Sequence, residues 1–513
     1  MNEALPTAGR KEWLGLAVLA LPVLLISITV TVLYLAVPFL SEDLRPSGSQ
    51  LLWIVDIYAF LLAGLLIVMG ALGDRIGRRR LLLWGATAFG VTSAAAAYAP
   101  TAELLIAARA LQGAAAATLM PPTLALIRNM FHDPGQRRTA VAVWAASFAG
   151  GSVLGPIVGG WLLEHFWWGA VFLVNVPIML LLLVLGPILL PEYRDPEPGR
   201  FDLWSAILSL AAVLPTVYGI KQVAGGGKVM EIAGAIALGL LFTVVFVRRQ
   251  RSLSNPMLDL RLFGDRGFGV FLLTGTLAIF ALVGVFYFVS QYLQMVLGLR
   301  PFVAGVFTLP AAVMALIGAL LAASIVKRFR PGPTIAAGML VTCAGFAVLA
   351  QVRPGSPDVI LLLGLALLGG GVGVVQAIAS DLVVAVAPPQ RAGSASAVLE
   401  AATEMGGALG VAVLGSMGLA VYRSVFQPPE GLPPEAASVA GETLGGAAGA
   451  AAELPQELAT AVLASAREAF TTGMRVSALV AAALLACTAA LTAVTLRHLR
   501  VDRAVAAERQ PSH

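Results

Sequence analysis

The run LLWIVDIYAFLLAGLLIVMGALGDRIGRRR at residues 51–80 decides the fold class of this chain. Its first twenty residues are apolar apart from Asp56, and as a helix they are long enough to cross a hydrocarbon core of roughly 30 Å. Glycines and four arginines follow where such a helix would leave the bilayer, and a second apolar run begins at Leu81. The stretch therefore predicts two membrane-spanning helices joined by a short basic loop.

The same alternation of long apolar runs and short polar loops continues along all 513 residues. The chain is 58% hydrophobic and 12% charged, with a mean hydropathy of +0.88, which excludes an ordinary soluble domain. The pattern predicts an all-α integral membrane protein. About fourteen spans are expected, at 13–40, 50–72, 81–99, 103–127, 138–163, 170–191, 203–221, 230–248, 267–297, 302–326, 332–352, 357–388, 392–422 and 471–496.

Lysines and arginines in the loops predict the orientation. With the N-terminus inside, they favour the cytoplasmic face by roughly three to one, so both termini are expected to be cytoplasmic in a bacterial inner membrane. The net charge of +5 then reflects topology, and no nucleic-acid partner is expected. The bases assigned to the outer side are Arg45, Lys221, Lys228, Arg300, Arg353, Arg423, Arg467 and Arg475.

A faint internal repeat indicates two related halves. The basic loop after the second span has a counterpart at residues 327–331, after the tenth. Two six-helix halves, 1–200 and 266–513, are therefore expected, separated by an inserted helix pair with its cytoplasmic loop at 201–265. The outer segment 424–466 is rich in Ala, Gly, Pro and Glu, and is expected to form a partly helical or flexible cap.

Several other classes of protein are disfavoured. Cys343 and Cys487 both lie in apolar runs, so neither a disulfide framework nor a metal site is expected. The chain lacks a G-x-x-x-x-G-K-[ST] phosphate loop, so ATP is not expected to drive it, and no enzyme activity or cofactor is expected. The expected partners are the lipid bilayer, small molecules and protons, and the chain is expected to act as a monomer.

The few charges inside the predicted spans mark the candidate site, because a charge in hydrocarbon normally faces a cavity or a partner. Glu400 and Glu404 are four residues apart and project from one face of a helix. Two carboxylates so close repel each other and lose hydration, which favours a proton on at least one of them near neutral pH. The alternative is an acidic pair satisfied by hydrogen bonds for packing.

Asp56 and Arg109 complete this set. Trp53 and Phe60 flank Asp56 on its own helix face, and a carboxylate between aromatic rings suits a delocalised cation. The alternative is a partly hydrated aspartate of the outer leaflet. Arg109, the only base assigned to a span, is expected either to brace the cavity and relay protons or to pair for packing. Asp381 lies near an inner helix end and is not assigned to the site.

Two glycine-containing stretches are candidate moving parts. Gly73 and Gly77 allow helix ends to approach closely, and Asp74 among the arginines could form an ion-pair latch that breaks when the halves rock; alternatively, the arginines only set topology. Gly151, Gly155 and Gly159 repeat every fourth residue on one face. Pro156 interrupts the backbone hydrogen bonds beside them, which predicts a kinked, close-packed helix.

These stretches carry a family resemblance over nearly the whole chain. Residues 70–80 resemble motif A of the major facilitator superfamily, 105–113 resemble motif B, and 151–160 resemble motif C, which marks its proton-coupled drug exporters. With LWIVDIY at 52–58 and the long last outer loop, the chain is most similar to the fourteen-span drug:proton antiporters of the QacA and LfrA type. That family is known for exporting quaternary ammonium compounds and cationic dyes.

The resemblance implies a proton-coupled multidrug efflux antiporter that exports lipophilic, mainly cationic compounds by alternating access. In the resembled exporters, acids at positions matching Glu400 and Glu404 serve protonation and cation recognition. The residues expected to couple protons are Glu400, Glu404, Asp56 and Arg109; those expected to bind substrate are Asp56, Trp53, Phe60, Tyr34, Glu400 and Glu404; and those expected to act in gating are Gly73, Asp74, Arg75, Gly77, Arg78, Gly151, Gly155, Pro156 and Gly159.

Two departures and three alternatives remain at this point. Thr29 stands where many of the resembled exporters have an aspartate, and Ala315 lies in a tenth span without the acid that favours divalent substrates. Export of an endogenous antibiotic or other secondary metabolite is the alternative function. A channel or a membrane receptor is disfavoured, because neither requires paired acids within the membrane.

Overall fold

The computed structural model describes residues 7–194, 202–253, 256–326, 328–387 and 392–495. Every regular element in these ranges is a helix, which confirms the expected all-α fold. The first helices are α1 (Arg10–Leu44), α2 (Gly48–Ile76), α3 (Arg78–Ala97), α4 (Ala102–Ala117), α5 (Met120–Met130), α6 (Pro134–His165), α7 (Ala170–Leu173) and α8 (Asn175–Leu189). The next are α9 (Leu203–Gly225), α10 (Val229–Ser252), the 3-10 helix η1 (Leu260–Gly264), α11 (Arg266–Gln291), the π-helical η2 (Tyr292–Val296), α12 (Pro301–Ile325), α13 (Pro331–Leu349) and α14 (Asp358–Val386). The last are α15 (Ala392–Gly410), the π-helical η4 (Val411–Gly415), α16 (Ser416–Val425), α17 (Pro434–Glu442), α18 (Leu444–Ala452) and α19 (Gln456–Thr495).

Thirteen helices of the described chain, some of them continuous across two or three elements, are long and apolar enough to cross a membrane. Thus α4 and α5 together form one span, and α15, η4 and α16 form another. The protein is a multi-pass membrane protein. α3 lies at the third predicted span but is outside these thirteen, because it starts with three arginines and continues with much Ala, Gly and Thr. The count of fourteen spans therefore stays a prediction.

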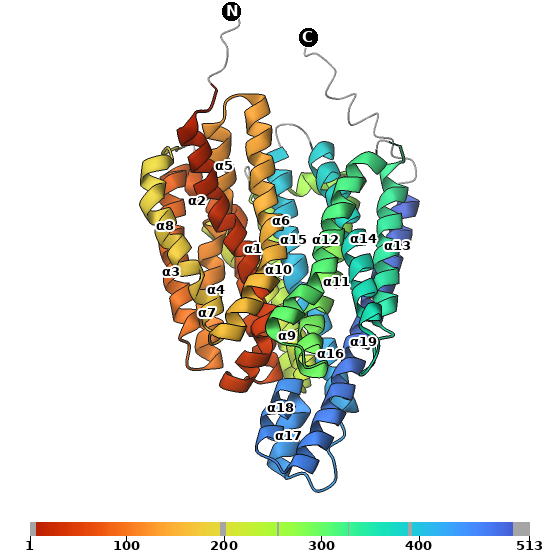
Figure 1. Ribbon diagram of the computed structural model, residues 1–513. Coiled ribbons are helices and arrows are strands. Elements are labelled where there is room, and N and C mark those ends of the chain that lie inside the picture. The colour runs from red at the N-terminus through yellow and green to blue at the C-terminus, as the bar shows by residue number, and fades with distance from the viewer. Residues whose placement is uncertain (1–6, 195–201, 254–255, 327, 388–391, 496–513) are drawn as a thin grey trace, which may run out of the picture.

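Figure 1 shows two groups of helices side by side, α1–α8 in the first and α11–α16 with α19 in the second. In the first group α1 packs on α6 and α2 on α4; in the second α14 packs on α12 and α13. The groups meet where α6 contacts α12 and where α2 contacts α15, and we call this boundary the seam. The predicted boundary between residues 200 and 201 lies outside the described residues, so the division at 1–200, 201–265 and 266–513 stays a prediction.

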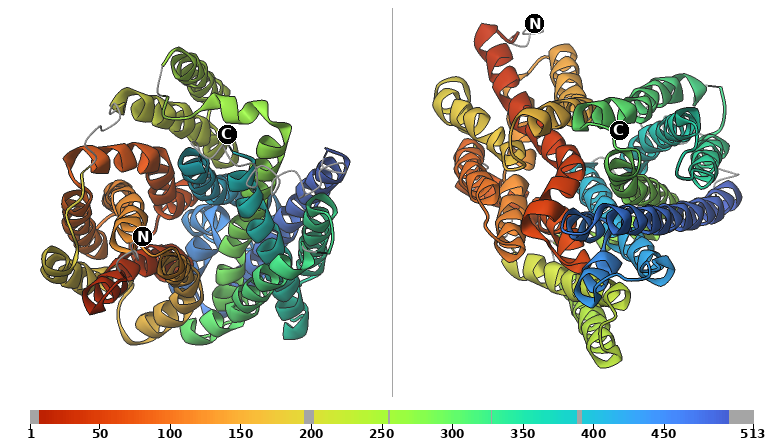
Figure 2. Two further views of the ribbon diagram at one scale, coloured as in Figure 1. Left: turned by 90° about the horizontal axis from the view of Figure 1, so that it is seen from above. Right: turned by 60° about the horizontal axis from the view of Figure 1, so that its bottom comes forward.

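The pair α9 and α10 lies at the edge of the bundle, where Figure 2 shows it beside both groups. The two helices pack along each other, and α9 also contacts both groups. On one side it meets α2 of the first group, and on the other it meets η4 and α16 of the second. α9 therefore covers the seam.

The two ends of the molecule differ. α1 begins and α19 ends at the same end, which we call the termini end, whereas α17 and α18 lie at the opposite cap end (Figure 1). The segment expected to be a partly helical or flexible cap is largely helical, and α19 already starts within it at Gln456. The hydroxyl of Tyr422 on α16 donates to the carbonyl oxygen of Ala440 at 2.6 Å and so ties α17 to the bundle.

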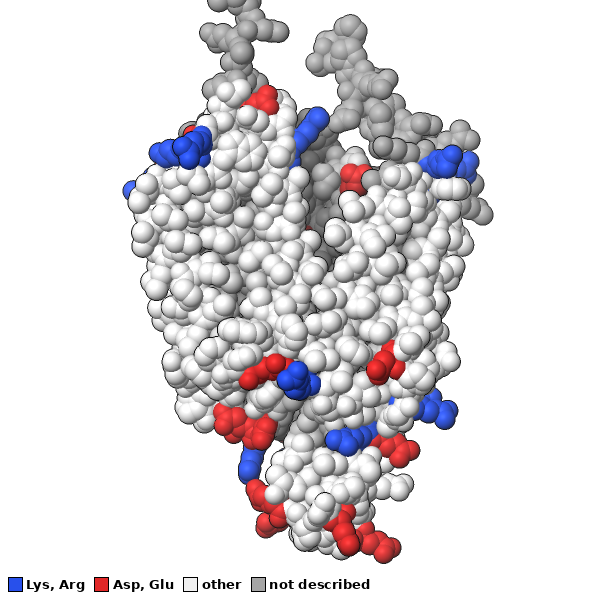
Figure 3. All heavy atoms as spheres, viewed as in Figure 1, with Lys and Arg blue, Asp and Glu red and all other residues white. Residues whose placement is uncertain are grey.

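The seam is closed at the cap end and hollowed at the termini end. Gln294 Nε2 of the second group donates to the Leu35 carbonyl oxygen of α1 at 3.1 Å. The backbone N–H of Phe302 donates to Glu164 Oε1 at 3.2 Å, which links α12 to α6. Figure 3 shows a groove between the two groups that opens at the termini end. The described chain therefore has the two groups apart at one end and joined at the other.

Candidate functional site

Asp56 lies at the seam and is paired with a base from α9. Lys221 Nζ donates to Asp56 Oδ1 at 2.8 Å, and each residue is only 1% exposed. Two expectations are therefore wrong: Lys221 is not in an outer loop, and Arg109 is not the only base within the spans. The reason is that α9 continues to Gly225, which places Lys221 one turn inside its end. The burial of Asp56 also rules out a partly hydrated aspartate in this conformation.

Trp53 completes a cation-binding arrangement around Asp56. Lys221 Nζ lies 3.6 Å from the centroid of the Trp53 ring, so the ammonium contacts both a carboxylate and a ring face. Trp53 and Phe60 are in edge-to-face contact with centroids 6.5 Å apart, and Phe60 belongs to the same buried apolar cluster as Val217 of α9. Asp56 and Trp53 thus share one cation, which here is Lys221, and the binding of an organic cation at this place stays a prediction.

Arg109 on α4 is 1% exposed and has no carboxylate within ion-pair distance among the residues described. Its guanidinium donates to the Ile54 carbonyl oxygen at 3.3 Å and to Gln112 Oε1 at 2.8 Å. Its central carbon lies 4.5 Å from the Tyr58 ring centroid. These contacts hold α4 against α2, as the bracing interpretation requires, and relay of protons by Arg109 stays a prediction.

A buried chain of neutral polar groups extends from Gln112 across the first group. Gln112 Nε2 donates to Ser93 Oγ on α3 at 2.7 Å, and Asn175 Nδ2 on α8 donates to the same oxygen at 3.3 Å. Thr29 Oγ1 on α1 donates to Asn175 Oδ1 at 3.2 Å. Thr29, one of the two departures noted in the sequence, therefore ends a hydrogen-bonded chain that leads to Arg109.

Glu400 and Glu404 lie on α15, both half-buried, at the helix that meets α2 across the seam. In the part of the chain that the structure describes, neither carboxylate forms an ion pair or a hydrogen bond, so the packing interpretation has no bond to support it. The two carboxylates act electrostatically on each other, and Glu404 acts on the hydroxyls of Tyr34 and Tyr58 in the first group. No cluster of three or more His, Cys, Asp or Glu that could hold a metal occurs in the described ranges.

Tyr34 on α1 connects these groups. It is 5% exposed, and its ring packs edge-to-face on Phe286 of α11, with centroids 6.2 Å apart across the seam. Its hydroxyl interacts electrostatically with Asp56, Arg109 and Glu404. Tyr34, Asp56, Arg109 and Glu404, from four different helices, thus lie near enough to interact electrostatically, and a shared role for the predicted site residues stays a prediction. Asp381 is exposed on α14.

The latch expected at Asp74 is local in this structure. Arg78 Nε donates to Asp74 Oδ1 at 2.8 Å, and both residues belong to the first group. No ion pair from Asp74 or Arg75 to the second group occurs among the described side chains. Since the groups are apart at this end, a latch between them is not formed here, and its role stays a prediction.

The glycines of the same loop fit its tight turn. Gly77 separates α2 from α3 with φ at 111°, and a Cβ there would lie 2.6 Å from Glu192 Oε1. The Gly77 N–H donates to the Gly73 carbonyl oxygen at 3.0 Å and closes the end of α2. Arg79 forms a 3.5 Å ion pair with Glu192, which fastens this turn to the segment after α8.

The glycine face of α6 is a contact surface. A Cβ added at Gly151, Gly155 or Gly159 would meet Leu24, Ser27, Thr31 or Val32 of α1. On the other side, the carbonyl oxygen of Pro156 lies against Gly305 of α12. α6 is therefore packed between its own group and the second group at the cap end of the seam.

Lys221 is the site residue that the sequence did not predict. A signal was present, because the mostly apolar run that contains Lys221 continues to Gly225, so that Lys221 lies inside the run. Asp56 lies at a similar depth from the outer end of its own span. Tyr287 of α11, which interacts electrostatically with Asp56, and Tyr58 were also not predicted. Nothing in their local sequence separates them from other aromatic residues of the spans.

Comparison with known proteins places the chain in a family. The model described as Major Facilitator Superfamily matches residues 19–411. "Multidrug efflux pump LfrA" of Mycolicibacterium smegmatis is 49% identical over 498 residues, covering 96% of this chain and 99% of that protein. "Methyl viologen resistance protein SmvA" of Salmonella typhimurium is 37% identical over 461 residues, covering 90% and 93%.

The fold comparison agrees. A bacterial homologue of the human lysosomal transporter Spinster, in an inward-facing and unoccupied conformation, aligns with a TM-score of 0.68 at 18% identity, over 96% of this chain and 98% of that chain. At this identity the likeness concerns the fold alone. Because the family model covers most of the chain and the relatives match over nearly their full length, this chain belongs to the major facilitator superfamily of membrane transporters.

Proposed function

We propose that this protein is a proton-coupled multidrug efflux antiporter of the bacterial inner membrane that exports lipophilic, mainly cationic compounds. The observation that carries the proposal is the pair Glu400 and Glu404, half-buried at the seam without an ion-pair partner among the described residues. Unpaired carboxylates within a membrane are costly unless they are neutralised, and reversible protonation neutralises them. An antiporter driven by protons needs such groups.

The substrate class is proposed from the surroundings of Asp56. A buried carboxylate beside the Trp53 ring is suited to a delocalised cation, and the aromatic rings of Tyr34 and Phe60 lie at the same seam. The names of two relatives, a multidrug efflux pump and a methyl viologen resistance protein, support the export of such compounds.

The proposed cycle is alternating access with the termini end in the cytoplasm. Substrate enters the groove at that end, and protonation of Glu400, Glu404 or Asp56 from the outer side displaces it once the cap end has opened. Moving one unit charge across about 100 mV is worth roughly 2.3 kcal/mol, so exchange of one proton for one monovalent cation gains nothing from the membrane potential. A second proton supplies electrical drive.

Ethidium transport in proteoliposomes with an imposed proton gradient tests this function. We expect gradient-dependent transport by the unchanged protein and a loss of at least about tenfold in Glu404→Gln and in the double variant Glu400→Gln/Glu404→Gln. Glu457→Gln, which changes an exposed glutamate at the start of α19, is the matched control and should transport normally. Transport that ignores the gradient, or that persists in the double variant, would falsify the proposal.

A further inference from the structure

Lys221 occupies a site that has the components of an organic-cation site. Its ammonium lies 2.8 Å from Asp56 Oδ1 and 3.6 Å from the centroid of the Trp53 ring. A carboxylate and an aromatic face are the two groups that recognise a delocalised cation in an apolar setting. In this conformation the chain therefore supplies its own cation to the site.

The contact between Lys221 and Asp56 leaves hydrogen-bonding capacity unused. Asp56 Oδ2 is buried and has no hydrogen-bond partner among the residues described. An ammonium has three N–H donors, yet Asp56 Oδ1 is the single acceptor found for Lys221 within the described ranges. A fully satisfied structural ion pair would use these groups, so the pair is open to exchange for another cation.

Other charged or titratable groups near Asp56 do not replace Lys221. Arg109 of α4, Tyr34 of α1 and Tyr287 of α11 interact with the Asp56 carboxylate only through space. Among the residues described, Lys221 is thus the one side chain that donates a hydrogen bond to Asp56. A cation that takes the place between Asp56 Oδ1 and the Trp53 ring must displace it.

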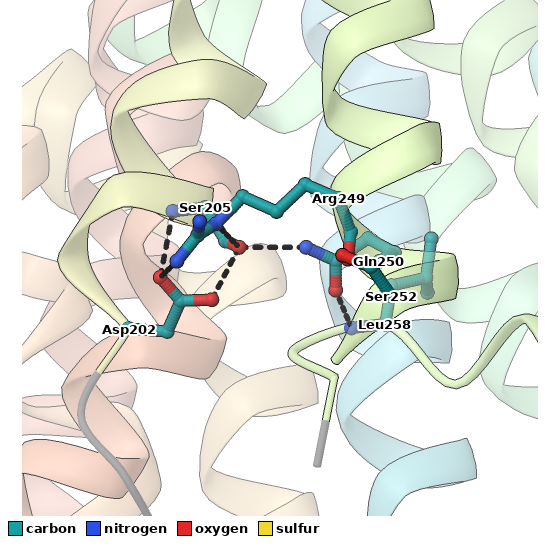
Figure 4. A network of polar contacts seen from close by, with 6 residues as sticks. All are labelled: Asp202, Ser205, Arg249, Gln250, Ser252 and Leu258. Atoms are coloured by element: carbon teal, nitrogen blue, oxygen red, sulfur yellow. Dashed lines mark hydrogen bonds and ion pairs between the residues drawn. The ribbon is translucent and has the colours of Figure 1, made fainter. Parts of the chain in front are cut away.

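The position of α9 suits such an exchange. The start of α9 and the end of α10 are joined by the polar contacts of Figure 4, where Arg249 contacts Asp202 at 2.9 Å and Gln250 donates to Ser205 Oγ at 2.6 Å. α9 contacts α2 of the first group from Leu210, which lies against Gly64, to Lys221 on Asp56, and it also contacts η4 and α16 of the second group. The helix pair therefore presents Lys221 at the part of the seam that must open for release at the cap end.

We propose that Lys221 is the resident cation of the Asp56–Trp53 site and that a transported monovalent organic cation displaces it, the Lys221 ammonium releasing one proton to water as it leaves. This rests on the proposed function and adds the residue that carries the exchanged proton. The site keeps its net charge, because the bound cation replaces the positive charge that Lys221 loses. When the cation leaves on the outer side, the amine takes up a proton there and pairs with Asp56 again.

The physical reason for proton release is the setting of Lys221. A buried ammonium without its carboxylate is a costly charge in a membrane protein, whereas a neutral amine is not. Arginine cannot release its proton under these conditions. The two side chains should therefore behave differently at position 221 even though both carry a charge when paired.

The test measures binding of tetraphenylphosphonium to the purified full-length protein in lipid nanodiscs, with released protons detected by an indicator dye in weak buffer. The unchanged protein should bind the probe and release protons. Lys221→Met should bind it roughly tenfold more tightly and release fewer protons, because the competing cation is gone. Lys221→Arg should bind it roughly tenfold more weakly, because its guanidinium stays charged. Lys228→Met, which changes an exposed lysine at the start of α10, should match the unchanged protein.

The outcomes separate this inference from the proposed function. The inference is overturned if the unchanged protein binds the probe and both Lys221 variants match it in affinity and in proton release. Lys221 would then merely neutralise Asp56. If Lys221→Met does not fold, as judged by thermal melting, Lys221→Arg decides alone. If the unchanged protein does not bind the probe, the cationic substrate class fails, and this inference fails with it.

Discussion

At the scale of single residues, Arg109 differs from the other buried charges because it has no acid partner within ion-pair distance among the described residues. Hydrogen bonds to Ile54 and Gln112 and the face of Tyr58 hold it instead. Replacing a paired charge leaves its partner unpaired, but Arg109→Met leaves no carboxylate unpaired. We therefore expect the melting temperature of Arg109→Met to stay within about 2–4 °C of the unchanged protein.

Transport should fall even though thermal stability is nearly unchanged, if Arg109 serves proton movement. We expect gradient-driven ethidium transport in Arg109→Met to fall by about tenfold or more. Thermal melting and proteoliposome transport on the same preparation measure both effects. Arg109→Lys is the companion variant, since it keeps the charge but not the planar donor fork. A large loss of thermal stability without loss of transport per folded molecule would assign Arg109 to packing.

At the scale of helices, the α9–α10 pair is held by the polar cluster of Figure 4. Burial acts to raise the pKa of the Asp202 carboxyl, but hydrogen bonds from Ser205 and Arg249, together with the Arg249 charge, outweigh it and hold the pKa below its ordinary value. A carboxyl with a lowered pKa stabilises the folded state above its ordinary pKa of about 3.9, and this contribution is lost as the pH falls through the lowered value.

Asp202→Ala should therefore loosen the first turn of α9 at neutral pH, because Asp202 also accepts the Ser205 N–H at 3.1 Å as the helix cap. Loss of such a cap is worth about 0.5–2 kcal/mol, and we expect protection of these amides from hydrogen exchange to fall up to roughly 30-fold at pH 7. The difference should shrink below pH ~4. Asp381→Ala, on the exposed surface of α14, is the control. Equal protection in Asp202→Ala and the unchanged protein at pH 7 would contradict this account.

The sequence predicted the helices well because length and hydropathy are local properties. Likewise, the glycine spacing of 151–159 indicated a contact face, and the structure places that face on α1. The Lys221–Asp56 pair was not predicted, because its residues are 165 apart in sequence and their contact depends on how α9 packs against α2. Counting the bases in alternate loops assigned Lys221 to the outer side. Charge alone does not distinguish an exposed base in a loop from a base that is paired one turn inside the end of a helix.

At the scale of the whole molecule, alternating access requires that the contacts closing the cap end can be broken. Those contacts include the hydrogen bonds of Gln294 to Leu35 and of Phe302 to Glu164, a 3.9 Å ion pair between Arg300 and Glu164, and the close approach of α6 and α12. The last depends on Gly305, because a Cβ there would overlap the carbonyl oxygen of Pro156. The equilibrium between the two conformations should therefore be sensitive to the volume of this one position.

Gly305→Ala should shift the protein towards the conformation that is open at the cap end, since overpacking of a close contact costs about 1–3 kcal/mol. Spin labels at Glu103→Cys and Asp358→Cys, both at exposed sites and in different groups, with Cys343 and Cys487 replaced, report the separation at that end. We expect a longer distance to gain population. Gly150→Ala on α6 is the control, because a Cβ there meets nothing within 4 Å while helix propensity rises equally. If both variants show the distance distribution of the unchanged protein, the contact at Gly305 does not limit opening, and the closing of this end depends on the other contacts between the groups, such as the Arg300–Glu164 ion pair.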